Sequence, residues 1–374
     1  MLSFWEKKSI EHIDTAIIGG GITGLSTAIS LAEKNRDLNI AILEAQSSPS
    51  GASTKNAGFA CFGSLTEILH DLKTYGTQET LNLIQNRVEG LRILTSRVRA
   101  TDMDYHSLGG FELLNSTNVA AQSKIEEVNL QLEPLFSGPV FSEEKSLVAS
   151  FGFNQEKVPT LIKNPLEGQL NPYKMIRALT AKALSLGVSI WYSARVSNIE
   201  KGNPFIIEIP DHQAKKIKCE QVVVCTNAFT KELIPELDLT PGRGQVLITQ
   251  PIENLKLKGT FHIDEGYVYF RNVGKRLLIG GARNLDFKGE TTTEFGNSRA
   301  ITDSLNHCIK DIILPKTPYA IQSQWSGIMA FGSERKPIIS SPYPGMHIGV
   351  RLGGMGVALG SWLGEELAKN HNQT

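Results

Sequence analysis

One segment near the N-terminus constrains the fold more than any other part of the chain. Residues 14–44 read DTAIIGGGITGLSTAISLAEKNRDLNIAILE, in which the pattern G-x-G-x-x-G stands between two short β-prone runs. The runs are Thr15 to Ile18 and Ile40 to Leu43, and apolar spacing predicts a helix between them, from about Ile22 to Glu33. A strand–helix–strand unit of this kind indicates a doubly wound α/β domain that binds a dinucleotide.

The three glycines of the motif each have a physical task. Gly19 allows a tight turn, Gly21 lets a pyrophosphate approach the backbone, and Gly24 lets the helix pack closely on the strand. The unpaired N–H groups at the start of the helix then face the diphosphate. Glu44, twenty residues after Gly24, can accept hydrogen bonds from an adenosine ribose and would repel a 2′-phosphate, which argues against NADP. The motif alone leaves FAD and NAD open.

Two further stretches are consistent with a bound nucleotide. The loop GASTKNAGFACFG, from Gly51 to Gly63, offers small residues, hydroxyls and a lysine that suit phosphate and ribitol, although a plain surface loop is the ordinary alternative. Gly353, Gly354 and Gly356 stand at the start of the last expected helix. Bare backbone there lets a flat, electron-rich group approach closely, and tight helix–helix packing is the alternative explanation.

The composition limits the function classes. A chain of 374 residues is too long for one compact core, so we expect two domains. Lys and Arg total 38, as do Asp and Glu, so no global field attracts nucleic acid or an anionic membrane. Neither the four cysteines nor the eight scattered histidines have metal-ligand spacing, and we predict no metal site. With no signal peptide and no apolar run of about 18 residues, we expect a cytoplasmic protein for which membrane contact is unsupported.

Ordered landmarks along nearly the whole chain give it a family resemblance. Besides the first unit and the two glycine-containing stretches above, they are EGQLNPYKMIRALTAKALSLGVSIWYSARVSNIE (167–200), VVVCTNAFT (222–230), PGRGQVLIT (241–249), GYVYFRNVGKRLLIGGAR (266–283) and QWSGIMAFGSERKPII (324–339). With these landmarks the chain resembles the D-amino-acid oxidase, glycine oxidase and sarcosine oxidase superfamily of FAD-dependent amine oxidoreductases. Any one landmark is weak evidence, but the ordered set is specific.

The resemblance implies the architecture. A doubly wound, Rossmann-like FAD-binding domain of the glutathione-reductase type would be assembled from residues 1–75, 155–232 and 325–374. A mostly antiparallel α+β substrate domain would be inserted as residues 76–154 and 233–324.

The resemblance also implies the cofactor and its contacts. FAD would be held non-covalently, with the last helix directing its N-terminus at the pyrimidine edge of the isoalloxazine, where reduction places negative charge. The cysteine that tethers flavin in the sarcosine oxidase branch would fall near Ile328–Met329, where this sequence has none. The implied cofactor-binding residues are Gly19, Gly21, Ile22, Thr23, Gly24, Glu44, Ala45, Gly51, Ala52, Ser53, Lys55, Asn56, Ala57, Val196, Thr226, Asn227, Gly354, Met355, Gly356 and Val357.

The sequence departs from the family at three places that concern the substrate and oxygen. Where amino-acid-oxidising members have Arg-Pro, the arginine gripping the substrate carboxylate, this chain has Met329-Ala330. The turn that follows reads Ser333-Glu334-Arg335 in place of the usual aspartate. The strand from Leu277 to Gly280 lacks the lysine that serves oxygen reduction in the sarcosine oxidase branch. We therefore expect neither a plain glycine-oxidase activity nor a fast reaction with oxygen.

Candidate substrate contacts come from two neighbouring strands. Alternation places Tyr267, Tyr269 and Arg271 on one face, and Ile279, Gly281 and Arg283 on one face of the next strand. Whether the two faces coincide depends on the intervening turn. Tyr267 matches the active-site tyrosine of the family, and Arg283 falls near a substrate-contacting position. The candidate catalytic residues are thus Tyr267, Arg283 and Arg271, with ordinary solvated arginines as the alternative.

The function implied by the resemblance is oxidation of a C–N bond in a small amine or amino acid. A hydride would pass to flavin N5, giving an imine that water hydrolyses. Two alternatives remain: an FAD-dependent 2-hydroxy-acid dehydrogenase, and a non-catalytic flavin-binding subunit of a larger dehydrogenase. The electron acceptor stays open between oxygen, a quinone and another partner, and no nucleic-acid partner is expected.

Overall fold

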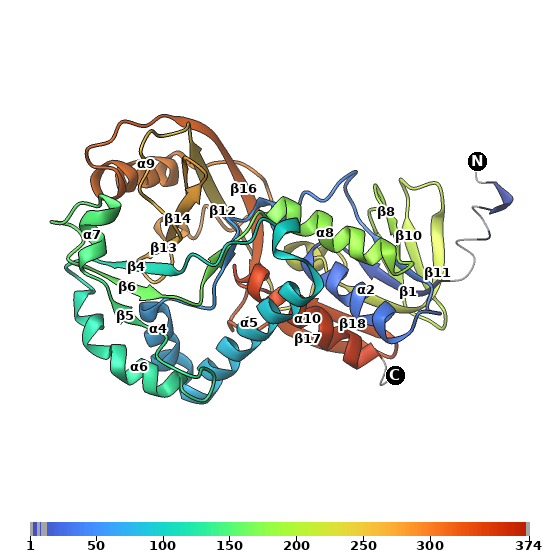
Figure 1. The fold of residues 1–374 in the computed structure, drawn as a ribbon. Helices are drawn as coiled ribbons and strands as arrows, with labels where there is room; N and C mark the ends of the chain where they lie inside the picture. The colour runs from blue at the N-terminus through green and yellow to red at the C-terminus, as the bar shows by residue number, and fades with distance from the viewer. Residues whose placement is uncertain (1–2, 6–7, 9–12, 372–374) are drawn as a thin grey trace.

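The fold consists of two lobes, each built on one β-sheet (Figure 1). A computed structural model describes residues 3–5, 8 and 13–371 of the chain. Within these residues no helix is both long enough and apolar enough to cross a bilayer.

The first sheet has a parallel centre. In spatial order its strands are β17 (Ile338–Tyr343), β18 (Met346–Val350), β11 (Lys215–Val224), β1 (Ile13–Ile18), β2 (Ile40–Leu43) and β8 (Ser189–Trp191), with β10 (Phe205–Ile209) and β9 (Asn198–Glu200) attached through β11. β1 pairs in parallel with both β2 and β11. The near-continuous apolar runs of β1 and β2 follow from this position, because a central parallel strand is buried on both faces.

Helices cover one face of the first sheet. They are α2 (Ile22–Lys34), α8 (Pro172–Ser185), α10 (Gly356–His371) and the end of α5 (Thr77–Arg97), which share one apolar core with the sheet. Asn171 caps α8, since its Oδ1 accepts a hydrogen bond from the Lys174 amide at 3.1 Å. The strand–helix–strand prediction is confirmed in β1, α2 and β2.

The second sheet is mostly antiparallel. Its order is β16 (Ile321–Phe331), β12 (Thr240–Thr249), β15 (Arg276–Gly281), β14 (Val268–Val273), β13 (Thr260–Ile263), β4 (Gly110–Leu114), β6 (Thr160–Asn164) and β5 (Ser142–Glu143), with one parallel pair between β13 and β4. An aromatic-rich core joins one face to α7 (Ser146–Phe151), α9 (Arg299–Cys308) and η5 (Ile309–Ile313).

The remaining elements are short or lie at the junction of the lobes. They are α3 (Ala52–Lys55), α4 (Leu65–Tyr75), α6 (Ile125–Leu132), the paired strands β3 (Phe59–Ala60) and β7 (Gly168–Gln169), and the single turns η1 (Ala100–Asp102), η2 (Val119–Lys124), η3 (Asn227–Glu232) and η4 (Arg283–Leu285).

Some strands and helices belong to a different lobe from the one that the sequence-suggested domain boundaries would give them. β6 falls within 155–232 and most of β16 within 325–374, the segments assigned to the FAD-binding domain, yet both strands pair in the second sheet. Leu94 of α5, from a substrate-domain segment, is buried in the core of the first sheet. Such partners lie far away in the chain, so local sequence patterns do not indicate them.

Candidate functional site

The main cavity of the described residues lies where the two lobes meet and measures about 880 Å³. One end is lined by Gly19, Glu44 and Cys225, which directly follow the carboxyl ends of β1, β2 and β11. The other end is lined by Met329 of β16 and by Tyr267, which directly precedes β14. Open α/β sheets bind nucleotides at the carboxyl ends of their strands, and the cavity starts at that edge.

The glycines of the first turn have distinct surroundings. Gly19 has φ +107°, and a Cβ on it would lie 2.8 Å from the Cys225 carbonyl oxygen. A Cβ on Gly24 would lie 1.9 Å from the Gly19 carbonyl oxygen, so only glycine lets α2 start this close to β1. A Cβ on Gly21 would instead lie 2.9 Å from Ser53 Oγ, in the gap between the first turn and α3. That gap is a cradle of the kind a diphosphate needs.

Glu44 and the α3 loop border this cradle. Glu44 Oε2 accepts a hydrogen bond from the Gly20 amide at 2.9 Å, which holds the carboxylate at the end of β2. Ser53 Oγ accepts from the Ile22 amide at 3.1 Å and ties α3 to the start of α2. Asn56 closes the loop, because its Oδ1 accepts from the Gly58 amide at 2.9 Å.

The start of α10 forms another wall. Gly353 and Gly354 have φ values of +55° and +84°, which strain any residue with a side chain. The helix begins at Gly356, so its first amides have no intrahelical acceptor and face the cavity region. Later glycines of α10 serve packing instead, since a Cβ on Gly360 would lie 2.5 Å from Ile22 Cγ2. Gly353 and Gly354 thus permit close approach of a ligand, whereas Gly360 permits close packing of the helix.

The sequence-predicted cofactor residues converge on this cavity with one exception. Gly24 does not line it. The residues that do are Gly19, Gly21, Ile22, Thr23, Glu44, Ala45, Gly51, Ala52, Ser53, Lys55, Asn56, Ala57, Val196, Thr226, Asn227, Gly354, Met355, Gly356 and Val357.

The register of the β14–β15 hairpin decides which candidate substrate residues meet. Tyr269 pairs with Gly280 and Arg271 with Leu278, so the Tyr269–Arg271 face is opposite to the face of Ile279. The two predicted faces therefore do not coincide within the hairpin. Tyr267 and Arg283 nevertheless both line the cavity, because the strand ends at Gly281 (φ +106°) and Ala282 (φ +58°) before Arg283.

Arg271 does not line the cavity. Its Nη2 donates to the Leu170 carbonyl at 2.9 Å and its Nε donates to the Ala57 carbonyl. Burial lowers the pKa of this guanidinium to about 10. Arg271 thus stabilises the loop after α3 through hydrogen bonds to backbone carbonyls, and the structure does not bring it to Tyr267 and Arg283.

Arg283 lies close to two aromatic rings at the cavity wall. Its Cζ is 4.0 Å from the centre of the Phe331 ring and 4.7 Å from that of Phe287. A Cβ on Gly242 would lie 3.4 Å from Arg283 Nη1, and Gly242 pairs with Met329 across β12 and β16. Burial lowers the pKa of Arg283, with Tyr267 acting in the opposite direction. No hydrogen bond of this guanidinium is found among the described residues, so its N–H edges are open to a ligand.

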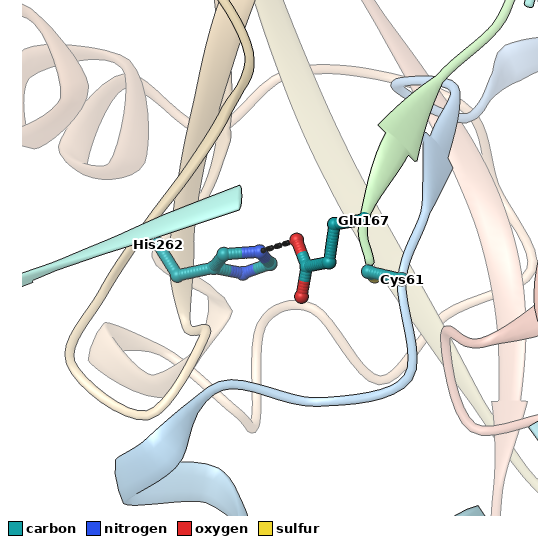
Figure 2. Close-up of side chains that lie close together, drawn as sticks. All are labelled: Cys61, Glu167 and His262. Atoms are coloured by element: carbon teal, nitrogen blue, oxygen red, sulfur yellow. Dashed lines mark hydrogen bonds and ion pairs between the residues drawn. The ribbon is translucent and has the colours of Figure 1, made fainter. Parts of the chain in front are cut away.

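A buried cluster that sequence reasoning missed lies beside the cavity (Figure 2). His262 Nε2 and Glu167 Oε2 are 2.9 Å apart, and the ligand atoms of Cys61, Glu167 and His262 all lie within 4.8 Å of one another. Thr260 Oγ1 donates to the same Glu167 oxygen at 2.9 Å. No local sequence pattern indicates this pairing, because His262 and Glu167 are 95 residues apart.

Within this cluster the positive charge of His262 is compensated by the negative charge of Glu167. Burial by itself would lower the pKa of His262, but Glu167, and beyond it Glu112 and Glu67, raise the pKa above its ordinary value. Burial raises the pKa of the Cys61 thiol well above its usual range, so the thiol stays protonated. Cys, His and Glu are zinc ligands in other settings. Here His262 and Glu167 already satisfy one another, and we interpret the cluster as a buried ion pair.

Comparison with known proteins gives a family match over nearly the whole chain. The profile of the family described as FAD dependent oxidoreductase matches residues 14–370. Gamma-glutamylputrescine oxidoreductase of Escherichia coli (strain K12) is 28% identical over 287 residues, which cover 72% of this chain and 64% of that protein. Glycine oxidase of Bacillus subtilis (strain 168) is 23% identical over 345 residues, covering 88% of this chain and 84% of that protein.

The solved structures agree in fold. The crystal structure of L-proline dehydrogenase from P. horikoshii matches with a TM-score of 0.78 at 17% sequence identity. The match covers 97% of this chain and 94% of that one.

Proposed function

Because the chain belongs to the family of FAD-dependent oxidoreductases, we propose that it oxidises a C–N bond of a small amine or amino acid. The relatives named gamma-glutamylputrescine oxidoreductase and glycine oxidase support a nitrogen-bearing substrate. FAD, when bound, supplies the chemistry by accepting a hydride from the substrate carbon at N5, and the resulting imine is hydrolysed by water.

This chain's residues would hold FAD along the whole cavity. The Gly21–Ser53 cradle takes the diphosphate, Glu44 takes the adenosine ribose, and the first amides of α10 face the pyrimidine edge. Gly353 and Gly354 keep the approach to that helix end free of side chains. The Tyr267 and Met329 end of the cavity is then left for the substrate.

The observation that carries the proposal at the substrate end is Arg283. Phe287 and Phe331 both lie close to its guanidinium, and its N–H groups, which are the groups that recognise carboxylates, have no hydrogen-bond partner among the described residues. Met329, in the position of the family's carboxylate-binding arginine, adds an apolar wall near Arg283. An amino acid would bind with its carboxylate at Arg283 and its amine near Tyr267.

The proposed reaction needs no strong proton acceptor from the protein. An amine that binds in its neutral form needs no strong general base before hydride transfer. His262, on the cavity wall, is kept protonated to a higher pH than usual by Glu167 and is therefore a poor base. Its role would be electrostatic.

Anaerobic bleaching of the flavin absorbance by a panel of amines, amino acids and 2-hydroxy acids tests the function. Bleaching by amines or amino acids is expected. Bleaching by 2-hydroxy acids alone would establish the alternative dehydrogenase reaction. A flavin that no compound reduces, in a protein that co-purifies with another chain, would indicate the non-catalytic subunit.

A further inference from the structure

A second arginine on the cavity wall has an unused hydrogen-bonding edge. Arg87 belongs to α5, which runs from the second lobe toward α10 (Figure 1), and its side chain lines the cavity although only 3% of the residue is exposed. Its Nη1 donates to the Phe62 carbonyl at 2.8 Å and lies 3.3 Å from Glu67 Oε1. The described residues provide no partner for the buried Nε, and no hydrogen bond of Nη2 is found among them.

The free atoms are those with which arginine binds a carboxylate side-on. Nε and Nη2 lie on one edge of the guanidinium and present two parallel N–H groups. Three other arginines of this chain bind a carboxylate through this same pair of atoms, at distances of 2.6 to 3.0 Å. The pairs are Arg92–Glu89, Arg99–Asp102 and Arg243–Glu290. Of these four arginines, Arg87 is the one that lines the cavity, and its Nε–Nη2 edge has no carboxylate partner among the described residues.

The nearby carboxylates of the chain are already engaged. Glu67 is shared between Arg87 Nη1 and Arg335 Nη1, Glu112 accepts from Ser64 and Thr66, and Glu167 accepts from His262 and Thr260. Buried donors without a partner are rare and destabilising. Because Arg87 lines the cavity, a carboxylate or a water bound there can supply the missing acceptor.

We propose that the Nε–Nη2 edge of Arg87 is a second carboxylate subsite, so that the substrate is an amine carrying two carboxylates. One carboxylate is held by Arg283 on the η4 wall and the other by Arg87 on the α5 wall, with the reacting C–N bond between them. This inference rests on the proposed amine oxidation. It differs from it in specifying an acidic or iminodicarboxylic amino acid as the substrate class.

The test uses the FAD-loaded protein and acids that cannot be oxidised. Acetate, malonate, succinate and glutarate are titrated in, and each dissociation constant is read from the perturbation of the flavin spectrum. In the wild type, one of the dicarboxylates is expected to bind about tenfold or more tighter than acetate. Arg87→Met removes that advantage, whereas Arg283→Met weakens both acetate and the dicarboxylate. Arg87→Lys keeps the charge without the fork and recovers only part of the preference.

Arg92→Met is the matched control, because Arg92 is an exposed arginine on the same helix paired with Glu89. It is expected to bind every acid like the wild type. A wild type without preference for any dicarboxylate overturns the inference, whatever the variants do. So does an Arg87→Met protein that keeps its FAD content and the full dicarboxylate preference, since water then fills the edge. These titrations need no turnover, so a failure of amine oxidation would appear only in the bleaching panel.

Discussion

At the scale of single residues, glycines that share one motif have different neighbours and therefore different tasks. A side chain on Gly24 would collide with the Gly19 carbonyl, which is backbone and cannot move aside. A side chain on Gly21 would meet only the Ser53 hydroxyl, across a gap that we assign to the diphosphate. Gly24 is therefore required for the fold, and Gly21 for binding of the ligand.

Gly21→Val separates these two roles. We expect it to abolish FAD retention while the folded state survives, because the new side chain fills the cradle between the first turn and α3. Flavin absorbance after gel filtration and far-UV circular dichroism measure the two properties. Full retention of FAD in this variant would place the diphosphate elsewhere.

Arg283→Met tests the carboxylate contact at η4. The KM for an acidic amine or amino acid should rise by about 10–100-fold, or about 1.4–2.8 kcal/mol, because methionine cannot copy a bidentate contact. FAD content should stay at the wild-type level. Wild-type kinetics in the variant would indicate an amine without a carboxylate, held by apolar walls that include Met329. Loss of flavin would instead place Arg283 on the cofactor.

At the scale of elements, local patterns predicted β1, α2 and β2, and a local pattern also accounts for the cap of α8. Each of these is specified by residues within one stretch: apolar periodicity, glycine spacing or an Asn-Pro start. The β14–β15 hairpin shows where such reasoning stops. Its register, and the two positive φ angles that redirect the chain before Arg283, depend on the turn and on pairing with β12, which no local pattern encodes.

The same limit explains the buried cluster. Glu167 lies just before β7 and His262 on β13, and each is unremarkable in its own segment. Only the packing of the β3–β7 pair against the second sheet brings them to 2.9 Å. The histidines have no metal-ligand spacing in the sequence, yet His262 contacts a carboxylate in the folded protein. Sequence spacing therefore does not report on contacts between distant segments.

The His262–Glu167 pair between these elements should make stability depend on pH. The pKa of His262 is raised in the folded state above its ordinary value of 6.5, so the protonated histidine stabilises the fold. This contribution is complete below pH 6.5 and is lost as the pH rises through the raised pKa. The difference in Tm between wild type and His262→Gln should thus shrink as the pH rises above about 6.5. A difference that is constant from pH 5.5 to 9 would show that folding does not shift the pKa of His262.

β15 carries the prediction about oxygen. Its buried residues Leu277, Leu278 and Ile279 offer no cation where the sarcosine oxidase branch has its lysine. We expect slow reoxidation of the reduced flavin by air and faster reoxidation by dyes or quinones, as measured by stopped-flow absorbance. Oxygen that reacts as fast as any dye would contradict this expectation.

At the scale of the whole molecule, the cavity draws its walls from both sheets and from segments along most of the chain. α10 closes the first lobe and lines the cavity, and β16 crosses from the second sheet to the junction. The division of the chain into two sequence-defined domains is therefore less informative for function than the order of its landmarks. Those landmarks line one cavity, some from the strand ends of the first sheet and others from within β12 and β16 of the second sheet.

The cysteines and histidines that line the whole cavity indicate how FAD is attached. Among the described lining residues, the cysteines are Cys61 and Cys225, and burial raises both thiol pKa values, that of Cys225 to about 12. A protonated thiol is a poor nucleophile toward a flavin. The lining histidines are His70 and His262, which are engaged by Glu265 and Glu167. Acid precipitation should therefore release about one FAD per chain into the supernatant, as measured by its absorbance. Yellow colour that stays with the precipitated protein would demonstrate a covalent bond to the flavin.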